Sequence, residues 1–318
     1  APLPAFSTES LGDVEEHLQH IAHTIGQSQS AVAGREQTLS FWEAFEPLPA
    51  SLRFALDMAL LDLWGKVLHQ PIKSIFGETA TDTISLNGLI GLHSIDECKR
   101  IAAKLVKEGY KTLKLKLGRP TPEDDLRCVK AVSEIAGNRI CLRLDPNQAW
   151  NQPDAEKVLP KLEEFPIEYI EQPIPAGGIK ALLAFRDASP VPIALDAIPA
   201  IPERIIAAIE AEAMDAIILK PTLLGGFRTI SDIIDVARQH QIKTVFTSAL
   251  ENSVALAGIA QLAAWFAPEV SHGLSTTTLF SFENLLTKPY QIVGGSLKLP
   301  AGPGLGLALQ PDEVQSSR

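Results

Sequence analysis

Acidic and basic side chains recur at the ends of short apolar segments in this chain. Apart from the pair Lys114 and Lys116, neighbouring members of the set are about 25 residues apart, the length of one strand-and-helix unit. In chain order they are Lys114, Lys116, Asp145, Glu171, Asp196, Lys220 and Ser248. Three carboxylates that converge would repel one another unless a cation lay among them, and an all-oxygen set suits Mg²⁺. The pattern therefore predicts a magnesium site made by Asp145, Glu171 and Asp196.

The stretch TLKLKLG (112–118) places two lysines on one face of an expected strand. Side chains of a strand alternate between its two faces, so Lys114 and Lys116 point the same way. Lys220 ends another apolar run, AIILKP. In a ring of eight strands Lys116 and Lys220 would face each other across the mouth, which suggests proton transfer on one or both faces of a bound molecule. We expect Lys114 to lower the pKa of Lys116, so that Lys116 can act as a base.

The predicted site is positively charged, although the formal net charge of the chain is −10. A magnesium ion and three ammonium groups outweigh three carboxylates, so we expect a small anionic substrate such as a dicarboxylate. No block of Lys or Arg stands out, which argues against nucleic acid or an anionic membrane surface as a partner. The sequence does not indicate the oligomeric state.

Cysteine usage and hydropathy predict a soluble cytoplasmic protein. The 3 cysteines form no CxxC pair, and no apolar run approaches the roughly 20 residues that span a bilayer. No signal-peptide pattern opens the chain. It begins APLPAFSTES without a starting Met, which suggests that upstream residues are missing.

The elements that must position these residues alternate between strand and helix patterns. Between the strands, apolar residues recur at helical spacing. Eight such units predict a (β/α)8 TIM barrel, in which all strand ends share one mouth. An open doubly wound sheet is the alternative, but no GxGxxG follows the first strand. The expected strands are 83–88, 112–117, 140–145, 167–171, 192–195, 216–220, 244–248 and 272–275.

The alternation of strand and helix patterns divides the chain into three predicted segments. Residues 1–82 lack it, contain helical stripes and are expected to form the N-terminal part of an α+β capping domain. Residues 83–288 would form the barrel, and the Gly- and Pro-rich residues 289–318 would return to the cap.

The lysine pair Lys114-x-Lys116, followed on later strands by three acids and Lys220, resembles the enolase superfamily, in its muconate-cycloisomerase-like subgroup. Several stretches look most like the o-succinylbenzoate synthase family, and the resemblance covers nearly the whole chain. They are LRLDPNQAW, IEQP, LKPTLLGG, TSALENSVALAGIAQLAAW and APLPAFS.

The resemblance implies a role for each residue. Asp145, Glu171 and Asp196 would bind Mg²⁺. Lys116 would remove the proton α to the substrate carboxylate, giving an enediolate stabilised by the metal, and would then protonate the departing hydroxyl. Lys220 would stay protonated on the opposite face, and Lys114 would assist. The reaction would convert 2-succinyl-6-hydroxy-2,4-cyclohexadiene-1-carboxylate to o-succinylbenzoate on the way to menaquinone or phylloquinone.

Further residues are candidates for substrate contacts. Ser248 and Ala249 precede an expected helix whose first N–H groups could hold a carboxylate, and in the family this region meets the succinyl tail. The segment containing Gly273 would supply another wall. Arg143 and Asn147 share the inward face with Asp145 by strand alternation.

The same residues leave other reactions open. An N-succinylamino acid racemase or dipeptide epimerase would use Lys116 and Lys220 as two bases, although GLSTTTLF stands where a dipeptide epimerase has DxD. An aldolase-like Schiff base on Lys220 and an inactive metal-binding relative are further alternatives. Ala197 stands where relatives usually carry Glu, which puts the surroundings of the metal in doubt.

Overall fold

The computed structural model describes residues 7, 9–26, 43, 45–75, 81–175, 177–197, 200–276, 286–287 and 291–310. Seven parallel strands form one sheet in the order β2-β3-β4-β5-β6-β7-β8. They are β2 Gly88–Ile90, β3 Thr112–Lys116, β4 Cys141–Asp145, β5 Ile167–Glu171, β6 Ile193–Asp196, β7 Ala216–Leu219 and β8 Lys243–Phe246. Strand order follows chain order throughout, as the predicted TIM barrel requires.

Short pairings close this sheet into a ring. Thr247, next to β8, bridges to Gly273, and β9 (Ser271–His272) pairs in parallel with β1 (Thr83–Leu86). The first predicted strand is therefore wrong in one respect, because it is divided at Asn87 into β1 and β2. β1 leaves the seven-stranded sheet to pair with β9 on one side and with β11 (Ser296–Lys298) on the other. The split strand thus joins the barrel to a second, four-stranded sheet that also contains β10 (Ile292–Val293).

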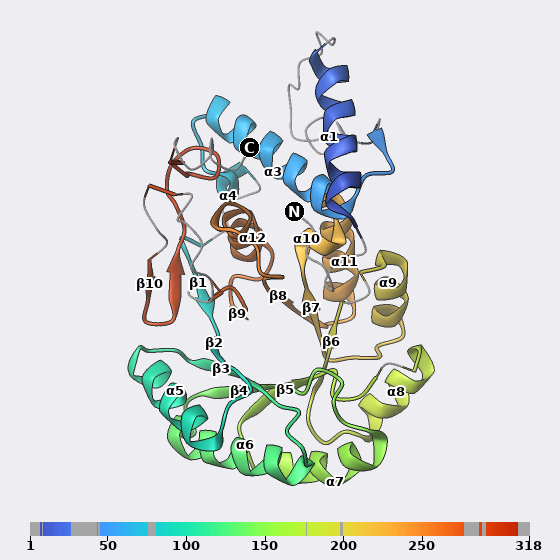
Figure 1. The fold of residues 1–318 in the computed structure, drawn as a ribbon, viewed down its shortest axis with the longest axis vertical. Coiled ribbons are helices and arrows are strands. Elements are labelled where there is room, and N and C mark those ends of the chain that lie inside the picture. Colours follow the sequence, from blue (N-terminus) through green and yellow to red (C-terminus); the bar gives the residue numbers. More distant parts are fainter. Residues whose placement is uncertain are drawn as a thin grey trace.

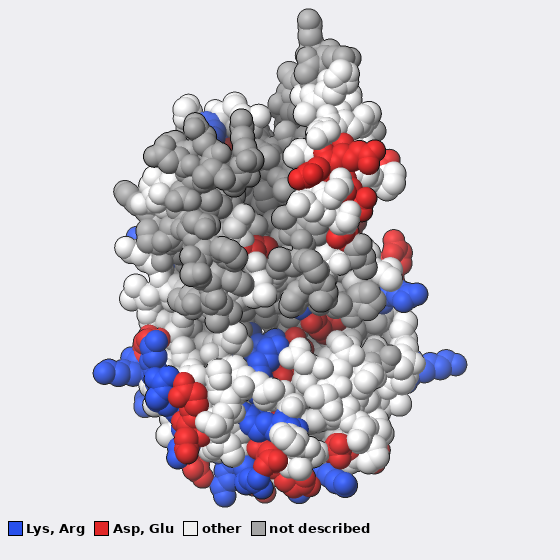
Figure 2. Space-filling view, viewed as in Figure 1, with Lys and Arg blue, Asp and Glu red and all other residues white. Residues whose placement is uncertain are grey.

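Helices cover the outside of the barrel strands, and Figure 1 shows α5 to α8 as a layer beyond β3, β4 and β5. Ser94 and Thr121 cap α5 and α6, each side chain accepting the N–H of the third residue after it. Around α5 to α8, in the lower part of the view in Figure 2, acidic and basic side chains are interspersed. The helices are α5 Ile95–Lys107, α6 Pro122–Ala136, α7 Gln152–Leu162, α8 Ile179–Ala188, α9 Pro202–Glu210, α10 Pro221–Leu224, α11 Phe227–Gln239 and α12 Ser253–Phe266.

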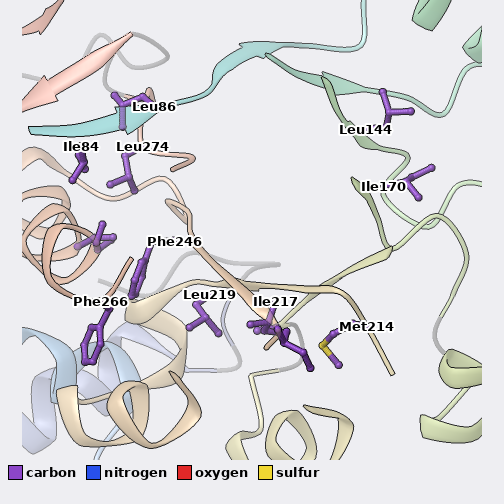
Figure 3. Packing of buried hydrophobic residues seen from close by; sticks show 14 of the residues in the cluster. Ile84, Leu86, Leu144, Ile170, Met214, Ile217, Leu219, Phe246, Phe266 and Leu274 are labelled. Atoms are coloured by element: carbon purple, nitrogen blue, oxygen red, sulfur yellow. The ribbon is translucent and has the colours of Figure 1, made fainter. Parts of the chain in front are cut away.

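The strands bury apolar side chains on both faces. Along β7, Ile217 and Leu219 join the large cluster between strands and helices, whereas Ala216 and Ile218 belong to a smaller cluster. Because neighbouring side chains alternate, the smaller cluster lies inside the barrel. Figure 3 shows labelled members of the large cluster on β4, β5, β7 and β8. Burial on both faces explains why these strands read as continuous apolar runs.

The cap contributes α1 (Leu11–Gly26), α3 (Ala50–Val67) and α4 (Ile72–Ile75). Asp57 on α3 accepts the N–H of Phe227 at 2.7 Å, at the start of barrel helix α11. Asp62, also on α3, accepts the N–H of Leu305 at 2.8 Å. One cap helix therefore contacts both the barrel and the C-terminal segment. The predicted domain boundary at residue 288 lies outside the described residues. Among those residues, no helix combines the length and apolarity needed to cross a membrane.

His272 lies where the ring closes, and its imidazole is fully buried. Its Nδ1 accepts the N–H of Phe246 at 3.1 Å, so the proton resides on Nε2, which donates to the carbonyl of Ala267 at 3.0 Å. Burial lowers the pKa of His272 to about 4, and the positive charge of Arg143 acts in the same direction. The folded protein therefore holds this histidine neutral.

We expect the free energy of unfolding to fall as the pH drops from about 6.5 towards 4, because in this window only the unfolded chain protonates the histidine. The loss is about 1.4 kcal/mol per pH unit. Urea unfolding at pH 7 and pH 5 should show a smaller loss in His272→Asn than in the wild type. His69→Asn, which changes an exposed histidine, is the control. Equal pH dependence in His272→Asn and the wild type would contradict this account.

Candidate active site

Three lysines and three carboxylates gather at the carboxyl ends of β3 to β7. Lys114 Nζ lies 2.6 Å from Glu171 Oε2 and 2.8 Å from Asp145 Oδ2. Lys116 Nζ lies 2.7 Å from the same Asp145 oxygen. The register of β3 against β4 produces this contact, because Lys116 and Asp145 are paired residues. The structure thus brings Lys114, Lys116, Asp145 and Glu171 together as the strand-end pattern predicts.

Lys220 and Asp196 form the other part of the cluster. Lys220 Nζ lies 2.5 Å from Asp196 Oδ2, and both side chains stand at the ends of neighbouring strands. The carboxylates of Asp145 and Asp196 both act electrostatically on Glu171, which lies on the strand between them. The lysine pair Lys114 and Lys116 is therefore connected to Lys220 through the three acids.

The three lysine side chains differ in their exposure to solvent. The side chain of Lys116 is 29% exposed, against 12% for Lys114 and 10% for Lys220. Lys116 is consequently the ammonium group with the most open approach from the mouth. Lys114 lies beneath it, enclosed by the two carboxylates that it contacts.

The charges in the cluster shift one another's pKa values. Burial disfavours ionisation of Asp145, but Lys114 and Lys116 hold its pKa well below the usual range. Burial raises the pKa of Glu171, and repulsion from Asp145 and Asp196 adds to this effect against the attraction of Lys114. Burial also disfavours the ammonium form of Lys114, yet Glu171 and Asp145 raise its pKa above the ordinary lysine value. Lys114 is therefore a firmly charged ammonium group, and its predicted tuning of Lys116 stays a prediction.

The three acids have the chemistry of a site for a hard cation. They supply only oxygen atoms, from three consecutive strands, and Asp196 Oδ1 is a buried atom without a hydrogen-bond partner among the described residues. Within the same residues, however, no three acidic, His or Cys groups already surround one point. Lysine ammonium groups lie against the carboxylate oxygens instead. Ala197 is buried and its N–H donates to the carbonyl of Ile218 at 3.1 Å.

Asn147 lies inside the cluster, as expected. Its Oδ1 accepts from Lys116 Nζ at 2.8 Å, and its N–H donates to Asp145 Oδ1 at 3.0 Å. Its φ of 51° is in the left-handed region, which Asn adopts more readily than most residues. The turn after β4 thereby folds Asn147 back over Lys116.

Arg143 does not lie at the mouth, so its predicted contact with substrate does not fit its position. It is fully buried, donates from Nε to Glu168 Oε2 at 2.8 Å and from Nη1 to the carbonyl of Ser271 at 2.6 Å, and covers the Tyr169 ring at 4.9 Å. It also lines a cavity of about 590 Å³ near the amino ends of the strands, together with Thr112, Lys243 and other residues. Strand alternation gives the face of a residue but not its depth, and Arg143 lies one layer below Asp145.

Ser248 and Ala249 are already bound to a carboxylate of the chain itself. The Ser248 hydroxyl donates to Glu251 Oε2 at 2.6 Å, and the Ala249 N–H donates to the same oxygen at 2.8 Å. Helix α12 begins at Ser253 and is capped by Asn252, so Ser248 and Ala249 precede a helix as expected but do not supply its first N–H groups. Glu251 was not among the predicted site residues, although the Ser-x-x-Glu spacing of Ser248 and Glu251 could have indicated this contact.

Glu251 and Gly273 hold the β8 end of the ring. Glu251 Oε1 accepts the hydroxyl of Thr222 at 2.5 Å, two residues after Lys220. Gly273 accepts the N–H of Ser248 at 3.0 Å, and any Cβ at this position would lie 2.4 Å from Thr247 Oγ1. Gly273 is therefore required for closure of the ring, whatever its contact with a substrate.

Known proteins resemble this chain over most of its length. The family model described as Enolase C-terminal domain-like matches residues 97–314. An o-succinylbenzoate synthase from Desulfotalea psychrophila is 36% identical over 251 residues, which are 78% of this chain and 67% of that protein. Muconate cycloisomerase 1 from Rhodococcus opacus is 28% identical over 289 residues, or 89% and 77% of the two chains.

Solved structures share the fold. The substrate-liganded L-Ala-D/L-Glu epimerase from Bacillus subtilis superposes with a TM-score of 0.85 at 23% identity, covering 96% of this chain and 85% of that one. Relatives with this fold are thus named for different reactions. The family match itself spans more than half of the chain. We conclude that the chain belongs to the enolase superfamily of TIM-barrel enzymes.

Proposed function

We propose that this chain is an o-succinylbenzoate synthase, a Mg²⁺-dependent carbon–oxygen lyase of menaquinone or phylloquinone biosynthesis. It would convert 2-succinyl-6-hydroxy-2,4-cyclohexadiene-1-carboxylate to o-succinylbenzoate by syn elimination of water. The observation that carries the proposal is the cluster of three lysines with three carboxylates, in which the whole expected set is present. The synthase relative, at 36% identity, supports this reaction among those of the superfamily.

The two catalytic lysines would flank the substrate from opposite sides of the mouth. Lys116 ends β3 and Lys220 follows β7, and three strands lie between β3 and β7 in the sheet. In a ring of eight, that separation puts their attachment points across from each other. Ammonium groups on both sides favour an anionic substrate between them.

Asp145, Glu171 and Asp196 would hold the Mg²⁺ ion, a role that suits their oxygen chemistry and the unpaired Oδ1 of Asp196 among the described residues. Held by these residues, Mg²⁺ would supply positive charge that stabilises the negative charge developing when the α proton leaves.

Lys116 would be the proton carrier. Its neutral Nζ removes the α proton, and the electron pair of that C–H bond enters the ring as the ring becomes aromatic. The resulting ammonium gives the proton to the departing hydroxyl, which leaves as water, so Nζ ends neutral again. Asn147 Oδ1, 2.8 Å from Nζ, orients this group. Because a single lysine serves both proton transfers, removal and return take place on the same face.

Lys220 and Lys114 would remain ammonium groups during the reaction. Lys220 faces the ring from the other side and attracts its negative charge and π electrons. Lys114 keeps its charge because two carboxylates enclose it, and its raised pKa agrees with this role. Ser248 and Ala249 would not bind the succinyl carboxylate, since Glu251 takes their hydrogen bonds.

A direct assay tests the proposed reaction. With Mg²⁺, the purified protein should produce o-succinylbenzoate, detected by its aromatic absorbance, and EDTA should abolish turnover. Exchange of the α proton of N-succinylamino acids without formation of o-succinylbenzoate would replace the proposal with the racemase alternative. Turnover that persists in EDTA, with substrate trapped on the protein by borohydride, would indicate Schiff-base chemistry instead.

Lys116→Ala supplies the matched variant for this assay. Loss of the base should lower kcat by about 10²- to 10⁴-fold, the usual contribution of a general acid–base group, without unfolding the protein. Lys104→Ala, which removes an exposed lysine on α5, should leave kcat unchanged. An unchanged rate in Lys116→Ala would remove Lys116 from the mechanism.

Lys114 can be tested without any assay of activity. In EDTA, Lys114→Met should lower the free energy of unfolding by about 3 kcal/mol, because Glu171 and Asp145 lose a buried counter-ion. Lys104→Met is the exposed control and should change it by less than about 1 kcal/mol. Urea unfolding measures both variants. A loss in Lys114→Met as small as in the control would show that the buried ammonium does not balance these carboxylates.

A further inference from the structure

Asp125 lies behind the cluster, on α6, and its carboxylate is fully buried. It accepts the N–H of Gly118 at 2.9 Å and the N–H of Arg119 at 3.1 Å, in the loop that follows Lys116. It also accepts the indole N–H of Trp150 at 2.9 Å, in the loop that follows Asp145. One buried side chain therefore binds the loops that follow both β3 and β4. We name Asp125, Gly118, Arg119 and Trp150 the Asp125 junction.

The two loops of the junction also touch directly. Gly118 has a φ of 108°, and a Cβ added to it would lie 3.0 Å from the Cβ of Ala149 and 3.4 Å from the carbonyl oxygen of Pro146. A side chain at position 118 would thus need both an unfavourable backbone conformation and space that the next loop fills. A shift of one loop would therefore displace the other.

Arg119 extends the junction to a third loop. Its Nη1 contacts Asp125 Oδ1 at 3.2 Å and lies 3.4 Å from the carbonyl oxygen of Lys116. Its Nη2 donates to the carbonyl of His93 at 2.8 Å, in the loop after β2. The loops after β2, β3 and β4 are thereby held to the Asp125 carboxylate, directly or through Arg119. Arg119 also contacts the backbone carbonyl of Lys116.

We propose that Asp125 is a positioning residue, which fixes Lys116 relative to Asp145 and Asn147. This inference rests on the proposed function, in which Lys116 carries the proton. Lys116 Nζ contacts one oxygen from each of the two residues, at 2.7 and 2.8 Å, and those residues lie at the start of the loop that Trp150 ties to Asp125. Relative movement of the loops would break these contacts, and a displacement of about 1 Å can cost about 10²-fold in rate.

Asp125→Asn tests the proposal with little change of volume. The new amide group would face N–H donors, so the junction would loosen. We expect kcat to fall about 10- to 100-fold while KM changes less than about threefold. Trp150→Phe removes only the link to the second loop and should lower kcat in the same way, but less. The double variant should lose less than the product of the two single losses, because both break one connection.

Hydrogen exchange supplies a readout that does not depend on turnover. In Asp125→Asn, amide exchange should become faster in residues 117–121 and 146–151 together. Asp215→Asn is the matched control, because Asp215 also accepts a backbone N–H, that of Ile193 at 2.7 Å, and an arginine, but contacts no loop of the mouth among the described residues. It should change neither kcat nor exchange in these two loops.

The outcomes separate this inference from the proposed function. If the wild type makes no o-succinylbenzoate, the proposed function fails, and the exchange experiment still decides whether Asp125 couples the loops. If the wild type is active but Asp125→Asn keeps its kcat within about twofold, or only one loop exchanges faster, the positioning role is overturned. Should Asp125→Asn fail to fold, Trp150→Phe provides the same test.

Discussion

Compensation of buried charge is the constraint on which the rest of this structure depends. Glu171 and Asp145 are almost fully buried at the strand ends, and so much negative charge would not stay ionised in a protein interior without positive partners. Lys114 is shared by both carboxylates, while Lys116 and Lys220 reach Asp145 and Asp196. Because each positive group lies on a different strand from its acid, the cluster forms only when β3 to β7 are paired in this register.

The barrel supplies the required precision through strand register. Lys116 opposes Asp145 because β3 and β4 are aligned without a shift, whereas the register between β4 and β5 shifts beside Arg143. At that shift Glu168 reaches Arg143 and Lys243, so a second charged group forms near the amino ends of the strands. The two groups differ in accessibility: Arg143 is fully buried, but Lys116 remains partly open at the mouth.

Spacing in the sequence predicted the strand-end cluster because the geometry of a parallel barrel is periodic. Each βα unit returns the chain to the same end, so residues about 25 positions apart become neighbours. The details that were wrong depend on non-local geometry. Division of the first strand at Asn87 follows from pairing with β9 and β11, which lie far along the chain. Arg143 was placed at the wrong depth because alternation repeats along the whole strand.

Local polar competition explains the remaining errors and the residues that were missed. Ser248 and Ala249 have the groups to bind a carboxylate, but Glu251 is close in sequence and satisfies them first. Asp125 gave no sequence signal, since an Asp in the first turn of a helix is ordinary. Its importance appears only when the loops after two neighbouring strands are seen to converge on it.

We expect the three acids to form a cation site whose oxygens the lysines share. A crystal structure grown with Mn²⁺ in place of Mg²⁺ tests it most directly, because anomalous scattering identifies the ion. We expect one ion bound by oxygens of Asp145, Glu171 and Asp196, with Lys116 and Lys220 released from those oxygens and still facing the mouth. Lysine–carboxylate pairs that persist unchanged, with the ion bound elsewhere or not at all, would contradict it.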